Sequence, residues 1–214
     1  MLDWVLKNYI EITGSLLGLI YVILSIRQNI SLWLVGILSS AFYIVVFFDS
    51  KLYANMSLQF YYLIMSIYGW YMWKKTDNKN QDAAAKLSVT RISTAVIIRC
   101  LLIGIFLLIL LFRILKVYTD SPFPGWDSFT TMLSIIATWM LTRKYIENWL
   151  LWIISDTVSV GLYFYMKLYP TTILFFVYTV MAAVGFIEWR KTIVVKDKIV
   201  FPESPVGVIR KEKR

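Results

Sequence analysis

Long apolar runs recur along almost the whole of this 214-residue chain, and they restrict its fold more than any other feature. Hydrophobic residues make up 59% of the sequence and charged residues 16%, well below the charged share of about a quarter in soluble domains. Most runs approach the length that an α-helix needs to cross a bilayer. The pattern therefore predicts an all-α integral membrane protein.

Seven of these runs are expected to be membrane-spanning helices. They cover residues 9–26, 31–48, 54–73, 94–115, 126–142, 148–166 and 170–189. We divide the chain into a first three-helix repeat (1–73), a cytoplasmic loop (74–93), a linker helix (94–115), a second three-helix repeat (116–191) and a basic cytoplasmic tail (192–214).

The net charge of +9 is carried mainly by loops and the tail, so it indicates membrane topology and not nucleic-acid binding. Lysines and arginines gather in the loop 74–93, in the turn at Arg143 and Lys144, and in the tail. These segments all lie on one side of a seven-span arrangement. The positive-inside rule therefore predicts a cytoplasmic C-terminus and an N-terminus outside.

The absence of histidine, with Cys100 as the one cysteine, restricts the available chemistry. No Ser–His or Cys–His nucleophile pair can form, and no close set of ligands predicts a metal site. A retinal protein would need a lysine in its last span, and 170–189 has none. We expect no enzyme, no cofactor and no metal, with a membrane scaffold as the rival class to a transporter.

The two three-helix units resemble each other in sequence. "KLY" occurs at 51–53 and at 167–169, and a Gly-x-x-x-Trp motif at 69–73 recurs at 185–189, each time before two basic residues. With one linker helix between them, both units run in the same direction, as parallel repeats do in transporters. We expect the glycines to permit close helix approach and the tryptophans to be interfacial anchors.

Polar residues present in only one unit are the better candidates for a site. An alignment with a three-residue insertion matches Trp33 to Trp152 and places Ile37 opposite Asp156. Two further pairs differ in the same way: Gln59 with Phe175, and Asn55 with Thr171.

Asp156 stands inside a span, where an ionised carboxylate costs about 2.5–3.5 kcal/mol on insertion scales. No lysine or arginine within a span is placed to neutralise it, so a wet cavity open to a ligand is favoured over a structural hydrogen bond. Helical spacing puts it on one face with four other residues. These are Trp152, Ser155, Ser159 and Tyr163.

Four residues on the third helices of the two units complete the candidate substrate site: Asn55, Gln59, Tyr62 and Tyr178. Rings, an acid and an amide together would suit a flat, positively charged heteroaromatic compound. Glu11 and Asp127 begin helices, where negative charge complements the helix dipole. An entrance to the site is the alternative role for both.

Three motifs strongly resemble the PnuC family of bacterial vitamin transporters over about residues 9–191: "FPGWDSF", "LTRKYIENWLLW" and "LYANMSLQFYYLIMSIYGWYMWKK". The resemblance implies a 3+1+3 helix fold like that of the SWEET transporters, and a homotrimer in the bacterial inner membrane. It also implies facilitated diffusion of an unphosphorylated B-vitamin that a cytosolic kinase then traps.

Carried over from the family, the substrate site falls on Trp152, position 156 and Gln59. Nicotinamide riboside members have Asn four residues after that Trp, whereas this sequence has Asp156. An acid favours a cation and can accept a hydrogen bond from the aminopyrimidine of thiamine. The resemblance therefore favours the thiamine branch (PnuT) over nicotinamide riboside, with neutral riboflavin the least expected substrate.

Overall fold

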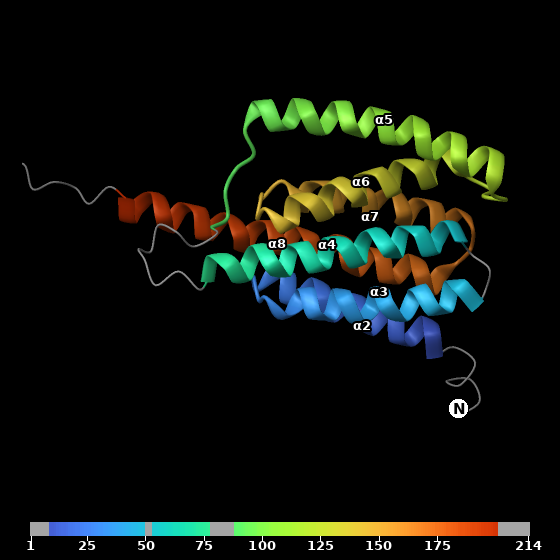
Figure 1. The fold of residues 1–214 in the computed structure, drawn as a ribbon, viewed down its shortest axis with the longest axis horizontal. Coiled ribbons are helices and arrows are strands. Elements are labelled where there is room, and N and C mark those ends of the chain that lie inside the picture. The colour runs from blue at the N-terminus through green and yellow to red at the C-terminus, as the bar shows by residue number, and fades with distance from the viewer. Residues whose placement is uncertain (1–8, 50–52, 78–87, 201–214) are drawn as a thin grey trace, which may run out of the picture.

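A computed structural model describes residues 9–49, 53–77 and 88–200, which form seven α-helices (Figure 1). Their bounds are α2 (Tyr9–Ile26), α3 (Ser31–Asp49), α4 (Tyr53–Asp77), α5 (Thr94–Tyr118), α6 (Pro124–Thr142), α7 (Asn148–Tyr165) and α8 (Tyr169–Val200). Each helix overlaps one of the seven predicted apolar runs. The prediction of an all-α fold with seven helices is confirmed.

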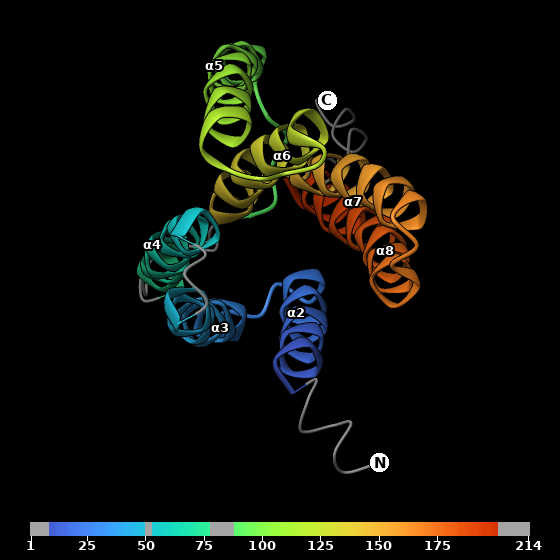
Figure 2. The same ribbon diagram turned by 90° about the vertical axis from the view of Figure 1, so that its right-hand side faces the viewer.

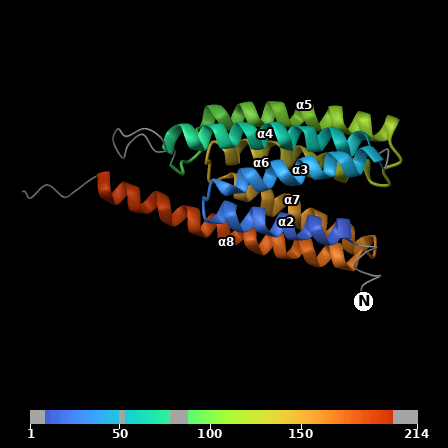
Figure 3. The ribbon, with the colours of Figure 1, turned by 60° about the horizontal axis from the view of Figure 1, so that its bottom comes forward.

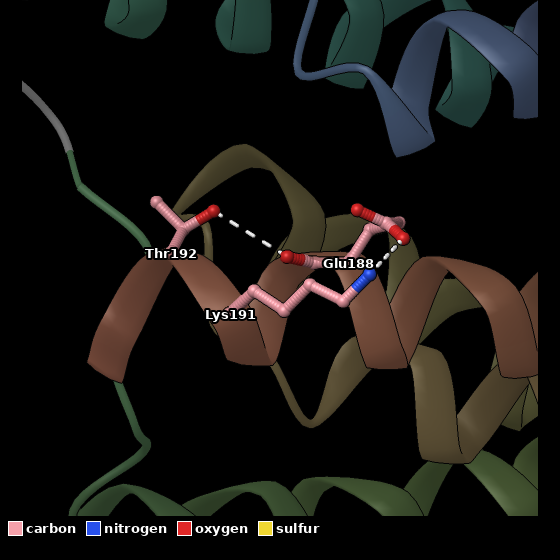
Figure 4. Close-up of polar contacts among 3 residues, drawn as sticks. All are labelled: Glu188, Lys191 and Thr192. Carbon is pink, nitrogen blue, oxygen red and sulfur yellow. Dashed lines mark hydrogen bonds and ion pairs between the residues drawn. The ribbon is translucent and has the colours of Figure 1, made fainter. Parts of the chain in front are cut away.

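The last helix continues to Val200, well past residue 189, where the apolar run was expected to end. On its exposed surface Lys191 Nζ lies 2.6 Å from Glu188 Oε1, and the Thr192 hydroxyl donates to the Glu188 carbonyl at 3.4 Å (Figure 4). An exposed ion pair of this kind contributes under about 1 kcal/mol. The end of an apolar run predicts where a span leaves the bilayer. The helix itself can continue beyond that point, because its backbone hydrogen bonds do not require apolar side chains.

Three helices are long and apolar enough to cross a membrane on composition alone: Ser31–Phe48 in α3, Thr94–Tyr118 in α5 and Tyr169–Ile193 in α8. Polar side chains interrupt several of the others, and in α6 and α7 many of them point inward. Buried hydroxyls there include Ser128, Thr138 and Ser159, while large apolar side chains face outward all along α5. An apolar exterior around a polar interior is the pattern of a membrane protein.

The two three-helix units, α2–α4 and α6–α8, pack against each other, and α5 lies outside them against α6 (Figure 2). They meet through two equivalent contacts, of α2 with α8 and of α6 with α4. The helices run along one common direction (Figure 3). Because α5 crosses once between the units, α6 runs parallel to α2, which gives the predicted 3+1+3 arrangement of parallel repeats.

Each unit contains the same contact between a tryptophan and a glycine. A Cβ atom added to Gly69 would stand 2.5 Å from the indole of Trp33, and one added to Gly185 would stand 2.6 Å from the indole of Trp149. Real Cβ atoms do not approach so closely, so only glycine lets these rings lie on the neighbouring helix. The expected role of the two glycines in close helix approach is confirmed.

The ring contacts correct the alignment of the repeats. Trp33 meets Trp73 edge to face with centroids 5.4 Å apart, and Trp149 meets Trp189 in the same way at 5.5 Å. Trp33 is therefore the counterpart of Trp149. The expected match of Trp33 to Trp152, and the three-residue insertion that it required, are wrong.

Without an insertion, Asp156 corresponds to Ser40 and not to Ile37, and Trp152 corresponds to Gly36. The sequence of α7 offers two tryptophans about one turn apart. Only their packing against α8 shows which of the two takes the place of the tryptophan in α3.

Gly185→Ala is expected to lower the free energy of unfolding by about 1–3 kcal/mol, because its Cβ overlaps the Trp149 ring. Gly69→Ala should cost a similar amount. Gly161→Ala, also on a helix, is the matched control, since a Cβ there meets nothing within 4 Å. Thermal unfolding in detergent micelles measures the difference, and equal unfolding temperatures for Gly185→Ala and Gly161→Ala would contradict this packing.

Candidate functional site

A cavity of about 470 Å³ lies between the two units, a size typical of small-molecule sites. Helices α2, α3, α4, α6, α7 and α8 all contribute to its wall. Residue order along these helices divides it into a half near Gln59 and Asp156, which we name the outer half, and a half near Ser66 and Trp149, which we name the inner half. The wall combines aromatic rings, hydroxyls and, among its described lining residues, one charged group.

That charged group is Asp156, which is only 6% exposed. Among the described residues, no cation forms an ion pair with it and no side chain hydrogen-bonds to its carboxylate. Tyr62 and Tyr178, at equivalent positions of α4 and α8, line the same cavity and are close enough to interact electrostatically with the Asp156 carboxyl group. A carboxylate buried without a cation requires water or a ligand to solvate it. The cavity is where either would reach Asp156.

The cavity wall brings together five of the predicted site residues: Gln59, Tyr62, Trp152, Asp156 and Tyr178. The other three predicted residues of the α7 face, Ser155, Ser159 and Tyr163, do not line the cavity. Ser155 donates to the Thr130 carbonyl of α6 at 3.4 Å, and Ser159 donates to the Ser155 carbonyl at 2.9 Å. Tyr163 packs on the ring of Phe175, with centroids 5.1 Å apart. One helical face is wide enough to meet both the cavity and a neighbouring helix.

Three further candidates differ in how much can be said of them. The side chains of Glu11 and Asn55 lie outside the part that the structure describes. Asp127, in the first turn of α6, accepts a hydrogen bond from the Ser121 hydroxyl and is absent from the described cavity wall. This geometry suits a carboxylate at a helix N-terminus.

Sequence reasoning missed most of the cavity's hydroxyl groups, which come from Tyr21, Ser25, Ser39, Ser40, Tyr43, Ser66 and Thr138. Small hydroxyls are common in membrane helices, so none of these stands out in an apolar run. The ungapped repeat is a signal that could have found several of them. For example, it places Ser25 opposite Leu141 and Ser66 opposite Ala182, so that in each pair only the first unit is polar.

Two tryptophans that do not line the cavity form hydrogen bonds across the repeats. Trp73 of α4 donates its indole N–H to the Thr142 carbonyl at the end of α6, at 3.2 Å. Trp189 of α8 donates to the carbonyls of Ser25 and Ile26 at the end of α2, both at 3.2 Å. These bonds satisfy carbonyls that a helix end leaves without a partner. Both tryptophans are buried, so their expected role as interfacial anchors is wrong.

Gln28 and Lys144, which are counterparts in the two repeats, meet beside the Trp73 ring. Both adopt positive φ, 52° and 54°, at the ends of α2 and α6. Lys144 Nζ donates to Gln28 Oε1 at 3.4 Å and lies 4.2 Å from the ring centroid of Trp73, which stabilises the buried ammonium. Contact between equivalent residues places the pseudo-twofold axis of the repeats at this point.

A second hollow, of about 420 Å³, lies on the outer face of α6 and α7. Apolar side chains such as Phe123, Trp126 and Leu162 dominate its wall. The Thr157 hydroxyl in it already donates to the Ile153 carbonyl at 2.7 Å. With no charged group in its described wall, it is the weaker candidate for a polar ligand.

Comparison with known proteins identifies related chains. The family described as "Nicotinamide mononucleotide transporter" matches residues 8–191. The nicotinamide riboside transporter PnuC of Escherichia coli (strain K12) is 28% identical over 203 residues, which cover 85% of this chain and 85% of that protein. The riboflavin/roseoflavin transporter RibM of Streptomyces davaonensis is 27% identical over 184 residues, covering 84% and 83%.

A solved structure shares the fold. The crystal structure of the vitamin B3 transporter PnuC superposes with a TM-score of 0.69 at 21% sequence identity, covering 88% of this chain and 83% of that one.

Trp189→Phe and Trp73→Phe are each expected to lower the free energy of unfolding by about 1–3 kcal/mol, because buried carbonyls lose their donor. Trp126→Phe is the control, since this ring is 54% exposed. Thermal unfolding in detergent again measures the change. Stability of Trp189→Phe equal to that of Trp126→Phe would show that the bonds across the repeats contribute nothing.

Proposed function

We propose that this protein carries nicotinamide riboside across the membrane. The chain belongs to the PnuC family of membrane transporters, which is also called the nicotinamide mononucleotide transporter family. Its relatives are transporters and not enzymes. The observation that carries the proposal is Asp156, a carboxylate on the cavity wall with no cation bonded to it among the described residues. Nicotinamide riboside has a permanent positive charge on a flat pyridinium ring, which such a carboxylate would bind.

The other lining groups match the rest of the nicotinamide ring. The Trp152 indole can stack on the pyridinium, and an aromatic face attracts a cation. The Gln59 amide, with both a donor and an acceptor, is complementary to the carboxamide group. Asp156 lies one turn from Trp152 on α7, so that charge and ring would act on the same part of the substrate.

Thiamine is the second candidate, because Asp156 would also attract its thiazolium and accept a hydrogen bond from its aminopyrimidine. The relatives named above transport nicotinamide riboside or riboflavin, and this support reverses the order expected from the sequence, in which thiamine came first. Riboflavin is neutral and would leave the carboxylate without a counter-charge, so we rank it third.

The proposed mechanism is facilitated diffusion. Substrate enters the outer half of the cavity, the two units rock about the pseudo-twofold axis, and the inner end opens to the cytoplasm, where a kinase traps the vitamin as its phosphate. We also propose a homotrimer in the bacterial inner membrane with the C-terminus inside. The cations at the end of α4, Lys74 and Lys75, support this orientation.

Asp156→Asn is expected to weaken binding of nicotinamide riboside by about 1–3 kcal/mol, because a charge-assisted contact is lost. The neutral, reduced form of the same riboside should lose far less. Isothermal titration calorimetry of the purified protein with both ligands measures the charge-dependent part directly.

Asp127→Asn is the matched control, since it removes an acid that lies outside the described cavity wall. Affinity for nicotinamide riboside should be unchanged in it. Equal affinities of wild type and Asp156→Asn for the cationic riboside would overturn the assignment of Asp156, and tighter binding of thiamine would make thiamine the leading substrate.

Uptake of labelled nicotinamide riboside into sealed proteoliposomes is expected to stop when the internal concentration equals the external one. An imposed proton gradient should change neither the rate nor the final level, because facilitated diffusion is uncoupled. Trp152→Ala proteoliposomes provide the low-transport control. Accumulation above the external concentration would contradict facilitated diffusion.

A further inference from the structure

One side of α4 carries a row of large apolar side chains, which we name the α4 stripe. Four residues with exposed fractions of 45–63% form it: Phe60, Ile64, Ile67 and Tyr71. Their spacing along the chain puts them on one face of the helix. Helix α4 lies at the edge of the bundle, where it packs against α3 and α6 (Figure 2). The α4 stripe rises by roughly 16 Å, about half of a hydrocarbon core of ~30 Å, so it spans one leaflet.

Two lysines follow the α4 stripe at the end of the helix. The Lys74 ammonium lies 5.0 Å from the ring centroid of Trp70, and the Lys75 ammonium lies 5.9 Å from that of Tyr71. Both lysines are exposed, and no carboxylate that the structure describes forms an ion pair with either of them. The aromatic rings attract the ammonium groups but leave their positive charge in place. The α4 stripe therefore ends in two charges that an anion can still bind.

Helix α8 of the second unit has an equivalent apolar row. Phe176, Val180 and Ile187 are exposed there, at the positions that correspond to the first, second and fourth residues of the α4 stripe. The lysine that follows this row, Lys191, lies 2.6 Å from Glu188 Oε1 (Figure 4). The positive charge at this position of α8 therefore has a partner within its own helix.

Two differences between the repeats account for the different surroundings of the two lysines. Lys75 is the counterpart of Lys191, but Met72 stands where α8 has Glu188. The ring of Tyr71, which lies beside the Lys75 ammonium, takes the place of an isoleucine. The first unit thus has an apolar residue in place of an acid, and a ring beside the cation. Both differences favour binding of an external anion over an ion pair within the helix.

We propose that the α4 stripe binds an anionic phospholipid, with an acyl chain along its four apolar residues and the phosphate at Lys74 and Lys75. The occupant is a lipid because the surface is mostly apolar, spans one leaflet and ends in positive charge at the level of the head groups. A lysine near the membrane surface strengthens the attraction to anionic lipids severalfold. None of these residues lines the central cavity, so the site does not depend on which substrate is carried.

Lys74→Gln/Lys75→Gln is expected to weaken binding of phosphatidylglycerol roughly tenfold, because both charges that attract the phosphate are removed. Phosphatidylcholine, whose head group has no net charge, should lose less than about twofold. Native mass spectrometry of the protein, titrated with each lipid in an uncharged detergent, measures both affinities. Equal affinities of wild type and the double variant for phosphatidylglycerol would overturn the proposal.

Lys75→Gln and Lys191→Gln form a matched pair of single variants, since they change exposed counterparts in the two repeats. Lys75→Gln should weaken phosphatidylglycerol roughly fivefold, and Lys191→Gln less than about twofold, because Glu188 already pairs with Lys191. Met72→Glu introduces the acid of α8 three residues before Lys75, and it should weaken the lipid as much as Lys75→Gln does. Equal losses in the two lysine variants would indicate general charge attraction and would overturn a site on α4.

The same spectra distinguish two other occupants. Inorganic phosphate that binds the wild type as tightly as phosphatidylglycerol would assign the lysines to a soluble anion. Oligomers that dissociate in Ile64→Ala/Ile67→Ala, with lipid binding unchanged, would assign the α4 stripe to a second copy of the chain. Either result would overturn the proposal. Weaker phosphatidylglycerol binding in that variant, with the oligomers unchanged, would support it.

Discussion

The whole arrangement depends on two indole hydrogen bonds that cross between the repeats. Trp73 donates to the end of α6 and Trp189 donates to the end of α2, so each unit supplies the partner for carbonyls that the other leaves unpaired. Within a membrane little water is available to hydrogen-bond to such carbonyls, so they depend on the indole N–H groups for a partner. Beside the Trp73 ring, Gln28 meets Lys144 on the pseudo-twofold axis of the repeats.

The cavity becomes selective where the repeats differ. Residues that pack one unit internally are duplicated, as in the contact of Trp33 with Gly69 and of Trp149 with Gly185. Several residues that face the cavity are not, and Asp156 of the second unit stands where the first unit has Ser40. A symmetric site would offer the same groups twice, whereas among the described lining residues of this cavity only the second unit supplies a carboxylate.

Much of the fold could be predicted because bilayer thickness and backbone hydrogen bonding leave few choices for an apolar run. All seven helices and the parallel repeats follow from hydropathy and motif order. Of the candidate site, Trp152, Asp156 and Gln59 stood out as polar or bulky exceptions, and they do line the cavity. Ser25 and Ser66 did not stand out, since a serine in a span is as often bonded to its own helix as exposed to a cavity, and only their apolar counterparts Leu141 and Ala182 distinguish them.

The sequence by itself determined the membrane-spanning helices, their order and the presence of an acid in the interior of the sixth, because hydropathy and charge are properties of the chain. The tertiary structure alone decided which residues are equivalent and which face the cavity. Trp149 and Trp152 are about one turn apart and look interchangeable in sequence. One packs on Gly185 and the other lines the cavity's middle, because helix rotation is set by the close contact that glycine permits.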